Sequence, residues 1–148
     1  ACGGYGVMFT SHDDFVESAK RTQESMFAAV SADELVSLEC QSPRRTERST
    51  GAEVVDVLRI ERDFEDERVW RIFHDIQETS FDGPRARQQS KDMLGFGKVA
   101  TSALTIATPE ANAQVERGEQ GLWEATLTAN LSSTDVPAEA LVCKAYRR

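Results

Sequence analysis

A ten-residue run near the C-terminus, Leu122 to Leu131, alternates apolar and polar side chains more cleanly than any other part of the chain. Apolar residues occupy every second position from Trp123 onward, with glutamate, threonine and asparagine between them. Because successive side chains of a strand point to opposite faces, the run predicts a β-strand with one buried and one solvated face. We expect a central strand whose apolar face receives Phe15, Met26 and Val30 of an N-terminal helix.

A charged break separates two blocks of strand-forming residues in the middle of the chain. The blocks are rich in Val, Ile, Phe and Trp, which favour strands, and residues 63–67 between them are mostly acidic. We therefore predict a hairpin of two strands, about Glu53–Arg62 and Arg68–Ser80. A single long helix over residues 52–80 is the alternative, because short apolar runs are ambiguous. Further strands, separated by turn residues as in an antiparallel meander, are expected at residues 98–108, 111–117, 122–131 and 138–146.

The N-terminal part of the chain carries helix signals. Apolar residues recur at helical spacing behind a polar cap, which predicts a helix from about Ser11 to Val30. Ser31 and Glu34 form a capping-box pattern, which predicts a second short helix from Ala32 to about Cys40. Because helices come first and strands follow, the expected fold is α+β, with N-terminal helices packed on a curved antiparallel β-sheet.

Length and charge restrict the class of protein. The chain of 148 residues suits one domain, which we place at residues 11–148, behind a Gly-rich tether or edge segment at residues 1–10. The formal net charge of -8 argues against nucleic acid as a partner, because binding a phosphate backbone needs a basic face. No apolar run approaches the roughly 20 residues that cross a bilayer. Neither a Gly-rich phosphate loop nor a nucleophile elbow occurs, so no cofactor is expected.

Three cysteines leave several arrangements open. Cys40 and Cys143 would form a disulfide in an oxidising compartment, or remain two buried thiols that act as small hydrophobes. The cysteine spacing fits no zinc pattern, so no metal site is expected.

The first four residues are Ala1-Cys2-Gly3-Gly4. This start resembles the end of a bacterial lipoprotein signal peptide, in which a small residue precedes the cysteine that becomes the lipidated N-terminus. The resemblance implies a diacylglycerol on Cys2 and an exported domain, periplasmic or anchored to the outer membrane. A membrane would then be contacted only through that anchor. The alternative is an ordinary cysteine at this position.

In outline, residues 11–148 resemble the NTF2-like/cystatin-like group, in which N-terminal helices precede a curved antiparallel sheet. The group includes enzymes, ligand binders and small exported lipoproteins. The resemblance therefore implies a fold and, at most, a pocket between helix and sheet, because function does not follow from fold.

His74 and Asp75 are the candidates for general acid–base chemistry. Adjacent strand residues point to opposite faces, so these two side chains cannot easily cooperate. A structural histidine is the alternative.

Two further groups of residues suggest binding. Trp70 and Trp123 would line a ligand pocket or belong to the core. Arg44 and Arg45 could meet arginines of a second loop to form an anion site, since guanidinium groups suit carboxylate and phosphate; solvated loops are the alternative. The second loop contributes Arg85 and Arg87.

Three hypotheses for function follow. The first is a non-enzymatic exported domain, with a lipid anchor as an option, that binds an envelope protein or a small ligand. The second is an NTF2-like pocket enzyme with His74 as general base. The third is a structural subunit of a larger assembly.

Overall fold

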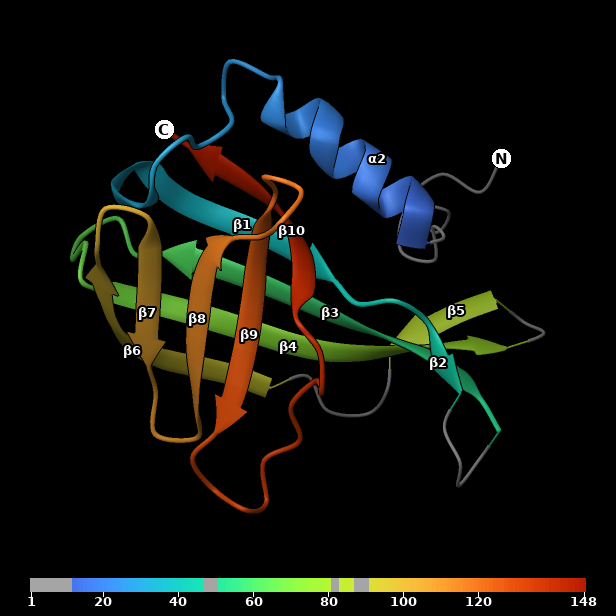
Figure 1. Ribbon diagram of the computed structural model, residues 1–148. Coiled ribbons are helices and arrows are strands. Elements are labelled where there is room, and N and C mark those ends of the chain that lie inside the picture. The colour runs from blue at the N-terminus through green and yellow to red at the C-terminus, as the bar shows by residue number, and fades with distance from the viewer. Residues whose placement is uncertain (1–11, 47–50, 81–82, 87–90) are drawn as a thin grey trace.

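The computed structural model describes residues 12–46, 51–80, 83–86 and 91–148 (Figure 1). Within these ranges the chain forms one α-helix, α2 (His12–Gln23), a short 3-10 helix, η1 (Ala32–Glu34), and ten strands. The strands are β1 (Leu35–Gln41), β2 (Arg45–Thr46), β3 (Glu53–Arg62), β4 (Val69–Ser80), β5 (Gly83–Ala86), β6 (Lys91–Val99), β7 (Ala103–Ala107), β8 (Ala111–Arg117), β9 (Trp123–Ala129) and β10 (Leu141–Arg147).

Eight of these strands close into an antiparallel barrel. The neighbours run β3-β1-β10-β9-β8-β7-β6-β4, and the pairing of β3 with β4 joins the two ends. The short strands β2 and β5 extend the sheet beside β3 and β4, away from the barrel (Figure 1). Every barrel strand therefore has two neighbours, and among the described strands the free edges belong to β2 and β5.

The expected α+β class is wrong, and residues 35–41 explain why. They form β1 rather than the second predicted helix, and β1 lies between β3 and β10. Leu38 is opposite Ile60 on one side and Ala145 on the other, so its backbone and side chain gain partners from both strands. This non-local pairing outweighs the helix-like spacing of the leucines, as tertiary context commonly does. The open sheet covered by helices, which the NTF2-like resemblance implies, is not formed.

The predicted hairpin of β3 and β4 is confirmed, and so is the antiparallel arrangement. Glu53 to Arg62 pair in continuous register with Thr79 to Trp70. The Asp63 carboxylate at the tip accepts hydrogen bonds from the backbone N–H groups of Glu65 and Asp66, so it caps the turn.

The strand expected at residues 98–108 is instead the end of β6 followed by β7, with a turn at residues 100–102. The sequence Gly95-Phe96-Gly97 lies inside β6, although glycine usually weakens a strand. A Cβ atom at Gly97 would overlap the indole ring of Trp70, and one at Gly95 would overlap the backbone carbonyl of Ala107. Glycine at both positions therefore allows close packing of β6.

Apolar side chains fill the barrel interior. The largest fully buried side chains belong to six of the barrel strands and include Trp70, Leu38, Leu58, Ile60, Ile72, Met93, Leu104, Ile106 and Leu141. On β9, Trp123, Ala125 and Leu127 are buried as the alternation predicted, whereas Ala129 and Leu131 are exposed near the end of the strand. Trp70 and Trp123 both belong to this core.

Helix α2 lies outside the barrel, against β10 (Figure 1). Phe15 and Ala19 are its buried residues. The Lys144 ammonium group of β10 lies over the Phe15 ring, 4.9 Å from the centroid. The expectation that the buried face of β9 receives the helix is therefore wrong, because that face points into the barrel.

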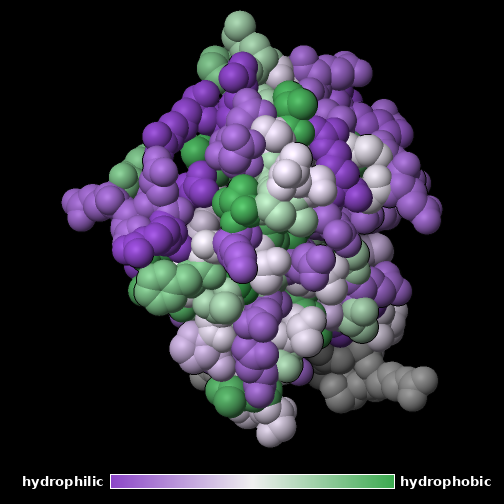
Figure 2. Space-filling model, turned by 60° about the vertical axis from the view of Figure 1, so that its left-hand side comes forward, coloured by the Kyte–Doolittle hydropathy of each residue, from purple (hydrophilic) through white to green (hydrophobic). Residues whose placement is uncertain are grey.

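The helix also ends at Gln23 rather than Val30. Residues 24–30 form a turn that is fixed by backbone contacts: Ala28 makes a β-bridge to Tyr146, and the Ala29 N–H donates to the Ala145 carbonyl at 3.1 Å. Met26 and Val30 are 73% and 71% exposed, so their predicted burial is wrong. Figure 2 shows green, apolar atoms projecting at the top of the molecule, the level of this turn in Figure 1. The capping box behind the turn is confirmed and stabilises η1.

Serine in place of Met26 or Val30 should change the free energy of unfolding by less than about 0.5 kcal/mol, because neither side chain contributes to the core. Chemical denaturation measures this effect. The matched variant is Ala29→Leu in the same turn, where overpacking a 1% exposed site should cost roughly 1–3 kcal/mol. A large loss of stability in Met26→Ser would show that the Met26 side chain is buried rather than exposed.

Among the described residues, no helix has the length and apolar character needed to span a membrane.

Candidate functional site

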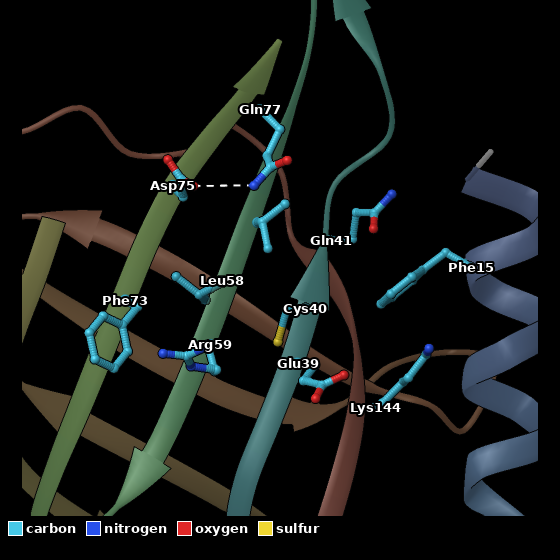
Figure 3. A pocket seen from close by; sticks show the side chains of 11 residues that line it. Phe15, Glu39, Cys40, Gln41, Leu58, Arg59, Phe73, Asp75, Gln77 and Lys144 are labelled. Atoms are coloured by element: carbon cyan, nitrogen blue, oxygen red, sulfur yellow. Dashed lines mark hydrogen bonds between the residues drawn. The ribbon is translucent and has the colours of Figure 1, made fainter. Parts of the chain in front are cut away.

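A groove of about 420 Å³ runs along the outside of the barrel, between α2 and the hairpin of β3 and β4. In Figure 3, α2 forms one side, β4 the other, and β1 lies between them. The lining residues come from α2, β1, β3, β4 and β10, and are Phe15, Glu39, Cys40, Gln41, Val57, Leu58, Arg59, Phe73, Asp75, Gln77 and Lys144.

Strand alternation places the hairpin's polar and aromatic side chains on this outer face. Phe73, Asp75 and Gln77 occupy every second position of β4 and all line the groove. On β3, Arg59 is opposite Phe73 and Val57 is opposite Asp75. The Arg59 guanidinium lies 4.5 Å from the centroid of the Phe73 ring, a cation–π contact, and pairs with a carboxylate of its own strand.

Asp75 has a buried side-chain oxygen without a hydrogen-bond partner among the described residues. Its Oδ2 accepts a hydrogen bond from Gln77 Nε2 at 3.2 Å. Its Oδ1 is buried and has no hydrogen-bond partner. No described cation forms an ion pair with this carboxylate. Buried acceptors are nearly always bonded in folded proteins, so the open acceptor is a feature that needs an explanation.

The opposite side of the groove is also amphipathic. Phe15 projects from α2 toward the strands, with Lys144 beside it and Glu39 on β1 below (Figure 3). Glu39 and Lys144 are cross-strand neighbours. The groove thus combines two aromatic rings with two carboxylates and two cations, and can hold a molecule that has both an apolar body and a charged group.

A disulfide fixes the strands beneath the groove. Cys40 of β1 and Cys143 of β10 are directly opposite in the register and are bonded, with a Cα–Cα distance of 4.0 Å. From the sequence alone, a disulfide and two free thiols were both open alternatives for this pair. The predicted lipid attachment residue Cys2 lies outside the described residues.

His74 lies away from this groove and faces the barrel interior, while Asp75 faces out. His74 is 4% exposed, and its Nε2 lies 3.1 Å from Oδ1 of Asp56, which is 2% exposed. The expectation that neighbouring strand residues cannot cooperate is therefore confirmed for His74 and Asp75. Sequence reasoning missed Asp56 as the partner, because the contact depends on the hairpin register.

Asp56 is the centre of a buried polar cluster. Its Oδ2 accepts a hydrogen bond from Arg45 Nε at 3.3 Å, and its backbone N–H donates one to Ser42 Oγ at 2.9 Å. Burial raises the pKa of Asp56, but the hydrogen bonds and charges of His74 and Arg45 outweigh it, so the pKa falls below its usual value. The carboxylate lies between serine and histidine. The imidazole therefore does not activate the hydroxyl as it would in a catalytic triad.

Asp56 should make the protein less stable in acid. Because its pKa is lower in the folded than in the unfolded state, its contribution is complete above about pH 4 and is lost as the pH falls further. Urea unfolding from pH 2.5 to pH 6 should show a smaller loss on acidification for Asp56→Asn than for the wild type. Asp135→Asn, at an exposed carboxylate, serves as the control. Equal slopes for all three proteins would contradict the assignment.

The predicted anion site is only partly described. Arg44 lies 3.7 Å from Glu53, and Arg45 pairs with Asp56, so both guanidinium groups have acidic neighbours. The side chain of Arg85 and all of Arg87 lie outside the described residues. Within the described part of the chain, no group of three or more His, Cys, Asp or Glu side chains is arranged to hold a metal ion.

No family model, curated protein or solved structure matches the chain. By its fold and site, the protein is a closed antiparallel barrel with a flanking helix and an amphipathic outer groove.

Proposed function

We propose that this protein is a non-enzymatic binding domain that holds a small amphipathic ligand in the groove between α2 and the β3–β4 hairpin. The observation that carries the proposal is the buried Asp75 oxygen without a donor, in a groove with aromatic side chains on both sides. Small-molecule sites typically combine apolar walls with a few polar groups, and 420 Å³ falls within their usual range of roughly 300–1,000 Å³.

The disulfide supports an oxidising, extracytoplasmic location. Such bonds form and persist mainly in exported proteins. Cys40 and Cys143 are bonded directly across the neighbouring strands β1 and β10 of one chain. A periplasmic domain, with a lipid anchor on Cys2, agrees with this chemistry; the anchor itself rests on the sequence resemblance alone.

The packed barrel interior argues for the outer groove as the ligand site. Trp70 and Trp123 are core residues of that interior rather than walls of a lumen. A small ligand therefore needs a surface site.

Catalysis by His74 is the second reading, and the contact with Asp56 favours it, because a carboxylate can orient an imidazole that acts as a base. A substrate would have to reach a side chain that is 4% exposed. Binding of an envelope protein and the role of an assembly subunit stay predictions.

Filling the groove should abolish binding. In a two-dimensional NMR titration with benzyl alcohol, we expect shifts of backbone amides in β1, β3 and β4. Val57→Trp should remove them, because the indole occupies the space beside Asp75. Thr126→Trp, on the exposed outer face of β9, is the matched control and should leave the titration unchanged. Shifts confined to other strands would refute the proposed site.

A further inference from the structure

We infer that the ligand of this groove is an organic cation, a protonated amine on an apolar body, whose nitrogen binds Asp75. The inference rests on the proposed function, because it names the ligand class of the same site. It explains one specific observation, the buried Oδ1 of the half-buried Asp75 side chain, which has no hydrogen-bond donor among the described residues.

The charges around Asp75 favour a cation over an anion or a neutral molecule. Arg59, the nearest cation of the hairpin's outer face, is held by Glu61 at 2.9 Å and lies over Phe73. Lys144 lies on the far side, over Phe15. Neither forms an ion pair with Asp75 in the described structure. The carboxylate therefore keeps an uncompensated charge, and a cationic donor would supply both the missing hydrogen bond and the countercharge.

The remaining walls define the rest of the ligand. Phe73 and Val57 flank Asp75 on the hairpin side, and Phe15 faces them from α2. An aromatic or aliphatic body of modest size can lie between these surfaces while its ammonium group binds the Asp75 carboxylate, which must turn to present the buried Oδ1 to the groove. Gln77 donates to Oδ2 and so limits the directions in which the carboxylate can turn.

Three probes that share a phenyl ring and differ only in the charge of their polar group distinguish a preference for cations from binding in the groove as such. Benzylamine, benzyl alcohol and benzoate are titrated at pH 7 to tens of millimolar, with backbone amide shifts as the readout. We expect benzylamine to bind about tenfold more tightly than benzyl alcohol, and benzoate most weakly, because a charge-assisted hydrogen bond is worth about this factor.

Two isosteric variants identify the carboxylate that is responsible. Asp75→Asn should remove the preference for benzylamine and leave the affinity for benzyl alcohol unchanged. Glu39→Gln, at the other and exposed carboxylate of the groove, should reduce benzylamine affinity less than about threefold, because exposed ion pairs contribute little. The thermal midpoint of ligand-free Asp75→Asn should not fall, since Oδ1 has no bond to lose.

Each remaining outcome has a distinct meaning. Equal binding of the three probes in the groove would overturn the assignment of a cationic ligand and leave the groove as a site for small ligands. An undiminished preference in Asp75→Asn would overturn Asp75 as the anchor. If no probe shifts the amides of the groove, both the assignment of a cationic ligand and the proposed function are refuted.

Discussion

Aspartate in place of Leu127 should leave the protein without a stable fold at room temperature. Leu127 is 4% exposed and points into the barrel, next to Trp123 and Ala125 of its own strand and opposite Ala113 of β8. The variant loses roughly 1.5–3 kcal/mol of side-chain burial and also places a carboxylate in an apolar interior. Domains are stable by only about 5–15 kcal/mol, so the combined loss is expected to exceed what the fold can tolerate.

Circular dichroism melting and amide shift dispersion measure the effect of Leu127→Asp. For this variant we expect no cooperative melting transition and a narrow range of amide proton shifts. The control is Thr126→Asp, which places the same charge one residue earlier, on the exposed face of β9. That variant should lose less than about 1 kcal/mol. A cooperatively folded Leu127→Asp protein would show that this face of β9 is not in the core.

Loss of the disulfide should cost about 4–5 kcal/mol. Cys40 and Cys143 are separated by 103 residues, and the chain-entropy estimate for a loop of about 100 residues is roughly 4.7 kcal/mol. The bond joins β1 to β10, where the N-terminal part of the barrel meets the last strand. Its removal therefore frees the unfolded chain over most of its length.

The experiment compares Cys40→Ala/Cys143→Ala with wild type in urea, both in a Cys2→Ser background that removes the third thiol. We expect a large drop of the unfolding midpoint in the double variant, and a similar drop for the unmutated pair under reductant. A midpoint that is insensitive to both changes would contradict a disulfide and, with it, the main support for an oxidising compartment.

Local patterns predicted much of the sheet. The β3–β4 hairpin, β8 and the buried half of β9 follow from residues that are close in sequence, through alternation and strand propensity. The same alternation places Phe73, Asp75 and Gln77 on one face, so one side of the groove was readable from the sequence.

Non-local pairing accounts for what the sequence concealed. The spacing of Leu35 and Leu38 fits a helix, and only insertion between β3 and β10 makes residues 35–41 a strand. Gly95 and Gly97 are residues that usually weaken a strand, and their place in β6 follows from close contacts with Ala107 and Trp70 that only the barrel register creates. Neither closure of the sheet nor the position of α2 opposite Asp75 has a local signal, so the groove as a whole was not predictable.

The position of a bound amine in the groove would test the account most directly. In a crystal structure of the protein soaked with benzylamine, we expect the ring between Phe15 and Phe73. The ammonium nitrogen should lie at hydrogen-bond distance, about 2.7–2.9 Å, from Asp75 Oδ1. Benzylamine bound elsewhere, with the groove occupied by water and Asp75 Oδ1 bonded only to solvent, would contradict the assignment of this groove as a site for an organic cation.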